Sequence, residues 1–190
     1  AIGSLPIGTY RSVAFQPSLT VEVVDPGWAG SRDTPGLLSL VRESDPKGSI
    51  FALRVTEVIS NPCIEGDPGS QTGPSTPDVL GELGTLAHVT VTNRTATQVG
   101  GLAGTQAEVA IADGAQAACG GLVGSGVGVF VAGGEIWRAL PGEHFRVLSV
   151  GTGSGAVTLL VSADWSEPPS VQQLDSLYEL GNRILARVRF

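Results

Sequence analysis

Two glycine-rich segments have spacings close to those of phosphate-binding and nucleophile loops. Residues Gly151–Gly155 (GTGSG) would need Lys-Ser or Lys-Thr and then a helix to form a Walker loop, but Ala156 starts an alternating, strand-like segment instead. Residues Gly124–Gly126 (GSG) lack the G-x-S-x-G spacing of a serine nucleophile elbow. We therefore interpret the first segment as a hairpin turn and the second as a loop, and we predict no bound cofactor.

General acid–base chemistry has few candidate side chains in this chain. His88 and His144 are the two histidines, and Glu143 stands beside His144. Because neighbouring residues of a strand point to opposite faces, we interpret both histidines as solvated or capping side chains. Asp164 and Glu167 would form a catalytic carboxylate pair only with their carboxyl groups within about 5–10 Å of each other, a distance that sequence does not set. We predict no catalytic residue.

The two cysteines, Cys63 and Cys119, lie in glycine- and proline-rich surroundings without CxxC spacing. Both histidines are distant from them in sequence, so we predict no metal site. We favour a disulfide between Cys63 and Cys119, which would close a loop of about 56 residues and contribute roughly 4 kcal/mol; two inert thiols are the alternative. A disulfide predicts an extracytoplasmic location: secreted, periplasmic or on the cell surface.

Three tryptophans, Trp28, Trp137 and Trp165, each stand next to a turn. Burial of such a side chain contributes on the order of 2–3 kcal/mol, which makes core anchoring the simplest role. The alternative is that the three indoles line a ligand groove, since aromatic side chains are common in such grooves.

Composition excludes several classes of protein. The 190 residues carry 18 acidic and 11 basic side chains, a net charge of −7, and the basic residues form no cluster that could neutralise a nucleic-acid backbone. No apolar run reaches the roughly 18 residues of a transmembrane span. The chain starts at Ala1 with no signal segment before Leu5-Pro6, so we interpret it as a mature or trimmed product, with anchoring through an earlier segment left open.

The secondary structure that must position these residues is mostly short strands. The 27 glycines and 12 prolines indicate many tight turns. Residues 37–43 and 49–58 read as one hairpin, and residues 144–150 and 156–163 as another. Further strands are predicted over residues 8–15, 19–24, 87–92, 105–112 and 127–131.

Two helices are predicted. The first is short and starts at Thr76-Pro77-Asp78, with Thr76 as N-cap and Pro77 at the first helical position. The second spans residues 170–186, is capped by Ser170 and has an apolar stripe. The residues of that stripe are Val171, Leu174, Leu177, Tyr178, Ile184 and Leu185.

These elements predict an α+β fold in one domain over residues 1–190. We expect an antiparallel sheet of about six to eight strands, packed by the short middle helix and the C-terminal helix. The order of the segments GTYRSVAFQPSLTVEV, LAHVTVTN, VGGLAGTQAEV, IWRALPGEHFRVLSV and RILARVRF resembles exported bacterial domains of the PsbP-like and LpqN-like lipoprotein fold. That resemblance implies a binding or assembly role without catalysis, and it carries over no site residue.

The leading functional expectation is a non-catalytic, secreted or surface-anchored domain that binds a protein or a small ligand, and no nucleic acid. Such a domain predicts a concave pocket lined by aromatic side chains. A structural subunit of a cell-surface assembly would show a large apolar surface patch. A small hydrolase with an unrecognised site would show a polar cleft where titratable groups with perturbed pKa values meet.

Overall fold

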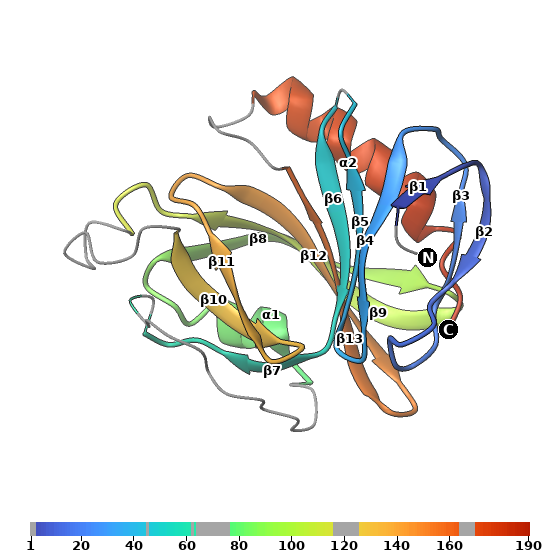
Figure 1. Ribbon diagram of the computed structural model, residues 1–190. Coiled ribbons are helices and arrows are strands. Elements are labelled where there is room, and N and C mark those ends of the chain that lie inside the picture. The colour runs from blue at the N-terminus through green and yellow to red at the C-terminus, as the bar shows by residue number, and fades with distance from the viewer. Residues whose placement is uncertain (1–2, 45, 62, 64–76, 116–125, 164–169) are drawn as a thin grey trace.

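The computed structural model describes residues 3–44, 46–61, 63, 77–115, 126–163 and 170–190 (Figure 1). Within these residues strands dominate, and two helices accompany them. The elements are β1 (Gly3–Leu5), β2 (Gly8–Arg11), β3 (Thr20–Val23), β4 (Trp28–Thr34), β5 (Leu37–Arg42), β6 (Gly48–Leu53), β7 (Val55–Val58), α1 (Val79–Leu83), β8 (Val89–Val99), β9 (Leu102–Ile111), β10 (Val127–Ala132), β11 (Glu135–Ala139), β12 (His144–Thr152), β13 (Gly155–Ser162) and α2 (Val171–Leu185).

The main sheet has eight strands in the order β1-β4-β5-β6-β13-β12-β9-β8, and every neighbouring pair is antiparallel. This confirms the large antiparallel sheet expected from sequence. The two expected hairpins are β5–β6 and β12–β13, and the Gly151–Gly155 segment forms the turn of the second. Two smaller sheets have the orders β11-β10-β7 and β2-β3.

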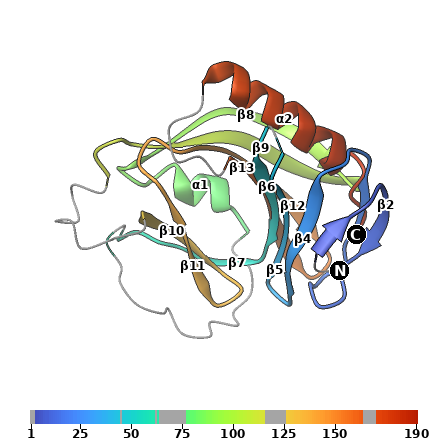
Figure 2. The same cartoon turned by 45° about the horizontal axis from the view of Figure 1, so that its top comes forward.

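Layers cover both faces of the main sheet. Figures 1 and 2 show α2 on one side and β7, β10, β11 and α1 on the other. Because alternate strand residues point to opposite faces, β6 supplies both cores: Ile50 and Ala52 belong to the cluster under α2, whereas Leu53 belongs to the cluster under the three-stranded sheet. The strands β2 and β3 join α2 in covering the first face, with Val21 and Val23 in its cluster.

Helix α2 begins where its sequence predicts, since the Ser170 hydroxyl and the Gln173 side chain form a reciprocal capping box. Its buried side is confirmed from Leu177 onward, but Val171 is 75% exposed and does not belong to the apolar stripe as expected. Two glycines allow a close approach to the sheet. A Cβ at Gly181 would lie 2.9 Å from the Val161 methyl groups, and one at Gly48 would lie 2.3 Å from Leu177 Cδ1.

Helix α1 is as short as expected. Its N-cap is Asp78, whose carboxylate accepts the Gly81 N–H at 2.9 Å, rather than Thr76, which lies outside the described residues. Asp78 also pairs with Arg94 on β8 at 3.0 Å. No helix of the described residues is both long and apolar enough to cross a membrane.

The predicted strand over residues 49–58 is two strands in different sheets. It breaks at Arg54, after which Val55 pairs with Ala132 in the three-stranded sheet. The apolar pattern continues through the break, because both halves are buried, so periodicity alone does not reveal the change of sheet. Strand β4 was not predicted, since its second half is polar and mostly exposed.

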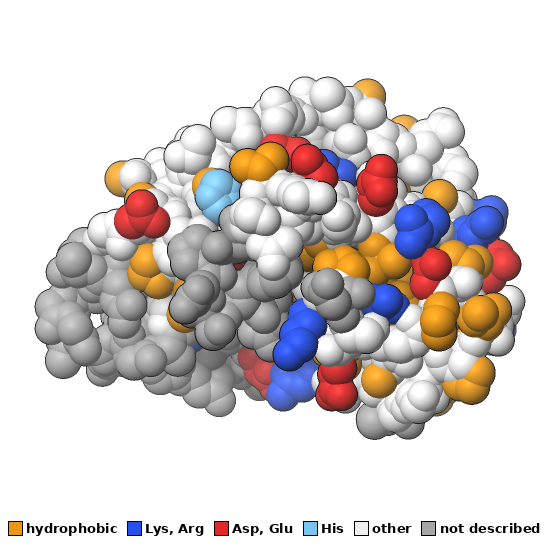
Figure 3. Space-filling model, turned by 90° about the horizontal axis from the view of Figure 1, so that it is seen from above, with side chains coloured by type: hydrophobic (Ala, Val, Ile, Leu, Met, Phe, Trp, Pro, Cys, Tyr) orange, Lys and Arg blue, Asp and Glu red, His pale blue; other side chains and the backbone are white. Residues whose placement is uncertain are grey.

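The surface seen from above carries acidic and basic side chains beside one another, with no continuous basic stripe on that face (Figure 3). Four ion pairs join described residues: Arg32–Glu135, Arg94–Asp78, Arg146–Glu108 and Arg183–Asp25.

Candidate functional site

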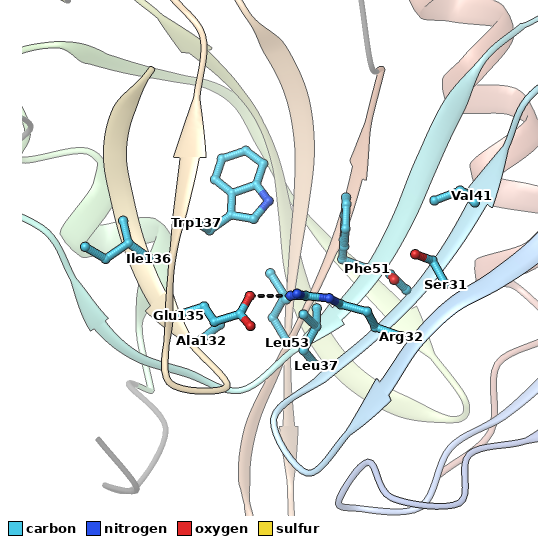
Figure 4. Close-up of a pocket in the computed structure, with 11 residues that line it drawn as sticks. Ser31, Arg32, Leu37, Val41, Phe51, Leu53, Ala132, Glu135, Ile136 and Trp137 are labelled. Carbon is cyan, nitrogen blue, oxygen red and sulfur yellow. Dashed lines mark hydrogen bonds and ion pairs between the residues drawn. The ribbon is translucent and has the colours of Figure 1, made fainter. Parts of the chain in front are cut away.

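A groove of about 230 Å³ lies between the main sheet and strand β11 (Figure 4). Its floor comes from β4, β5 and β6, and its opposite wall comes from the β10–β11 hairpin. The lining residues are Ser31, Arg32, Leu37, Ser39, Val41, Phe51, Leu53, Ala132, Glu135, Ile136 and Trp137.

The floor follows from the alternation of β5 and β6. Leu37, Ser39 and Val41 point into the groove, while the residues between them point into the cluster under α2. Ser39 stands opposite Phe51 in the β5–β6 register. The part of the floor that β5 and β6 supply is therefore apolar except for the Ser39 hydroxyl, which makes no hydrogen bond to any described residue although the side chain is only 3% exposed.

Trp137 forms the aromatic part of the wall. Its ring stacks on Phe130, with centroids 4.9 Å apart and planes 11° apart, and meets Phe145 edge-on at 5.0 Å. Both phenylalanines are fully buried. Since its ring is held by two buried partners, Trp137 is a preformed surface rather than a side chain that must be ordered by a ligand.

An ion pair spans the mouth of the groove. Arg32 on β4 donates from Nη1 to Glu135 Oε2 on β11, and the two side chains are 48% and 59% exposed. A register shift between Gly30 and Arg32 marks a β-bulge just before Arg32, and bulges commonly reorient side chains at such positions. Because an exposed ion pair stabilises by only about 0–1 kcal/mol, separating Arg32 from Glu135 costs little.

The two walls touch at a pair of glycines. A Cβ at Gly36, in the β4–β5 turn, would lie 2.6 Å from Cα of Gly133, in the β10–β11 turn. Gly133 has φ +61°, a conformation that glycine adopts without strain. This backbone contact sets the spacing between the floor and the wall.

The structure describes three of the acid–base candidates: Glu143, His144 and His88. The Glu143 carboxylate accepts hydrogen bonds from Ser162 Oγ at 2.7 Å and from the Leu140 N–H at 2.8 Å, which ties down a turn. His144 is exposed at the start of β12. His88 is half-buried near α1, and its burial lowers the pKa of the imidazole. Among the described residues, no three His, Cys, Asp or Glu side chains form a cluster that could hold a metal ion.

Several predicted site residues lie outside the described part of the chain, so no position is assigned to them. These are Cys119, Gly124, Ser125, Asp164, Trp165 and Glu167. Cys63 is half-buried against the cluster under the three-stranded sheet, and the described residues include no free cysteine. The pairing of Cys63 with Cys119 therefore stays a prediction.

Core anchoring was the simpler role expected of the three tryptophans and a shared ligand groove the alternative; the structure places Trp137 in this groove and Trp28 elsewhere. Trp28 is 1% exposed in the cluster under α2, on the opposite face of the main sheet. Trp28 stands opposite Leu5 of β1 and Arg42 of β5 in the sheet. Residues opposite one another share a face of the sheet, and Leu5 belongs to the cluster under α2. Trp28 thus has the core-anchoring role and does not line this groove.

Sequence reasoning missed the polar residues of the groove, Arg32, Ser39 and Glu135. The Leu-Leu-Ser-Leu-Val run carried a signal, since a buried serine hydroxyl needs a hydrogen-bond partner and an apolar strand face supplies none. Arg32 and Glu135 are more than a hundred residues apart, and nothing in their local sequence connects them.

Comparison with known proteins gives likenesses of fold alone. The chain is similar to the solution structure of cyanobacterial PsbP (CyanoP) from Synechocystis sp. PCC 6803, at 11% identity and a TM-score of 0.47, over 97% of this chain and 94% of that one. It is also similar to LpqN of Mycobacterium tuberculosis, described as involved in cell envelope biogenesis, at 13% identity and a TM-score of 0.33, over 98% and 80% of the two chains. PsbP-like and LpqN-like proteins are also those that the order of the sequence segments resembles. No protein-family model and no curated protein matches the chain.

Proposed function

We propose that this chain is a non-catalytic binding domain that holds its ligand in the groove between β5–β6 and β11. The observation that carries the proposal is the concave, mostly apolar lining around the fixed indole of Trp137. Binding pockets combine such a lining with a few placed polar groups, and here these are Arg32, Glu135 and Ser39.

The groove fits binding better than hydrolysis. Its two charged side chains are paired with each other and exposed at the mouth, whereas a general acid or base works from a position within hydrogen-bond reach of the reacting atom, with a pKa tuned by its surroundings. Loss of a measured turnover in a His144→Ala variant would contradict the non-catalytic proposal.

A groove-filling variant tests the site. Small apolar and amphipathic compounds are screened by ligand-observed NMR against the parent, Ser39→Leu and the matched control Thr90→Leu, which adds the same side chain at an exposed position of β8. We expect compounds to bind the parent and the control but not Ser39→Leu. Equal binding to Ser39→Leu would place the ligand elsewhere.

We further propose that the domain works outside the cytoplasm, as the two cysteines suggest. Mass spectrometry of the unreduced protein after alkylation should find neither Cys63 nor Cys119 modified. Cys63→Ser is the control and should free Cys119 for alkylation. Two alkylated thiols in the parent would remove this support.

A further inference from the structure

The polar atoms of the groove are mainly hydrogen-bond donors without a partner. Arg32 has five N–H donors, and Nη1 alone has a partner within the described part of the chain. The indole N–H of Trp137 donates to no described residue, and the same holds for the Ser39 hydroxyl.

These donors face one space. Arg32 reaches across from β4, Trp137 stands on β11, and Ser39 lies in the floor between them. Figure 4 shows the nitrogen-bearing edge of Trp137 turned toward Phe51 and toward the Arg32–Glu135 pair. A ligand between Phe51 and Trp137 would therefore have apolar contacts on its body and donors at one end.

We propose that the ligand is a small carboxylate with a flat aromatic or short apolar body, and that its carboxylate takes the place of Glu135 on Arg32. This inference rests on the proposed function and names the chemistry of its ligand. Glu135 is the carboxylate that pairs with Arg32 while no ligand is bound. Binding replaces this Arg–carboxylate pair by another one of similar strength. The net free energy of binding therefore comes from burial of the ligand's apolar body.

The donors favour an anion over a cation. An ammonium ligand could pair with Glu135 just as a carboxylate could pair with Arg32, but it would offer no acceptor to the Trp137 N–H. A carboxylate accepts from both guanidinium nitrogens at once, in the planar geometry that arginine recognises.

The volume limits the size of the body. A cavity of about 150 Å³ holds benzene, and pockets for larger ligands start near 300 Å³. At about 230 Å³, the groove accommodates one aromatic ring with a short side chain, or a short branched acyl chain.

The experiment compares three ligands of one shape: 3-phenylpropanoate, 3-phenylpropanamide and 3-phenylpropylamine. Affinities are measured at low salt by NMR titration against the parent, Arg32→Gln, Glu135→Gln and the groove-filling variant Ser39→Leu. The control is Arg94→Gln, whose arginine pairs with Asp78 away from the groove. We expect the parent to prefer the carboxylate. Arg32→Gln should weaken carboxylate binding about tenfold or more, with the amide unchanged, and Glu135→Gln should strengthen carboxylate binding several-fold by removing its competitor.

Any other outcome contradicts either the proposed ligand class, the proposed site or the proposed role of Arg32. If the amide or the amine binds in the groove as well as the carboxylate, or if Glu135→Gln weakens the carboxylate, the ligand class is wrong while the groove remains a binding site. If all three bind Ser39→Leu as they bind the parent, or if none binds the parent, the proposed site fails together with its ligand. A loss of carboxylate binding in Arg94→Gln equal to that in Arg32→Gln would show only a general charge effect and would reject the role of Arg32.

Discussion

The two faces of the main sheet are covered in different ways. Under α2, β2 and β3, side chains fill the space almost completely, and the void between Ile50, Ala52, Leu159 and Ile184 measures about 10 Å³. On the other face, β7, β10 and β11 cover only part of the sheet and leave the groove of about 230 Å³. The same strands supply both faces, so the difference lies in the covering elements.

A helix and a hairpin cover a sheet differently because their attachments differ. Helix α2 approaches through Gly181 and Gly48, which let its backbone and Leu177 sit close to the strands. The β10–β11 hairpin meets the β4–β5 turn at Gly36 and Gly133, and a stacked indole occupies the space behind that contact. A sheet can therefore be sealed on one face and remain open to a ligand on the other.

The largest expected effect comes from truncating a side chain on the sealed face. Leu177 is fully buried there, so Leu177→Ala should lower the free energy of unfolding by about 2–5 kcal/mol through lost burial and a residual cavity. The matched variant on the open face is Ile136→Ala, whose half-buried side chain lines existing space and should cost about 1 kcal/mol or less. Urea denaturation measures both, and equal losses would contradict the distinction between the faces.

Enlarging a side chain should also cost more stability on the sealed face than on the open face. Ala52 and Ser39 lie on neighbouring strands but point to opposite faces. Ala52→Leu must fit into a void of about 10 Å³ and should destabilise the protein by about 1–3 kcal/mol. Ser39→Leu adds its side chain to the groove of about 230 Å³ and should therefore cost less than Ala52→Leu. Thermal unfolding of the two variants provides the comparison, and a reversed order would mean that the groove is not open.

A smaller and pH-dependent effect concerns Asp33, which fastens the loop carrying the buried Phe15 to the sealed face. Partial burial alone would raise the pKa of the Asp33 carboxyl, but the N–H groups of Val13, Phe15 and Ala14 donate to it and together hold that pKa below its ordinary value. The hydrogen bonds to the ionised Asp33 carboxylate therefore stabilise the folded state above pH 4. This contribution is lost as pH falls through the lowered pKa of Asp33.

Urea midpoints measured across pH 2–7 test this account of Asp33. The urea midpoint of the parent should fall below about pH 4. The midpoint of Asp33→Asn should be lower than that of the parent at pH 7 and should fall less as the pH is lowered to 2. Asp113→Asn, at an exposed position after β9, is the control. If the midpoint of Asp33→Asn fell at low pH as much as that of the parent, other carboxylates would be responsible for the loss of stability in acid.

The ionisation of Tyr178 is expected to have the smallest effect on stability near neutral pH. Its burial, followed by the nearby Glu108, raises the pKa of the phenol to about 12, although Arg146, stacked 4.0 Å from the ring centroid, partly opposes the shift. Because the pKa of Tyr178 in the folded state lies above the ordinary value near 10, the buried neutral phenol contributes its full stabilisation at pH 7. This contribution is lost as pH rises toward 12. An ultraviolet titration of Tyr10→Phe, which retains Tyr178 as its one tyrosine, should show ionisation above pH 11, and a midpoint near 10 would mean that the α2 edge is open to water.

Local sequence determined those elements whose residues interact mainly with near neighbours. Ser170 and Gln173 contact each other within one helical turn, and the β12–β13 hairpin closes through the Gly151–Gly155 turn, so both were predicted correctly. The buried side of α2 followed from its period, apart from Val171, which is exposed at the first helical position.

Tertiary structure decided which sheet a strand joins and which side chains meet. The break at Arg54 is invisible in the apolar pattern, since Leu53 and Val55 are both buried, each in a different sheet. The candidate site likewise depends on contacts between Arg32 and Glu135 and between Gly36 and Gly133, which are about a hundred residues apart along the chain. Residue type and spacing predict local hydrogen bonds and turns, but contacts at such separations depend on how the sheets pack, because many packings satisfy the same alternation.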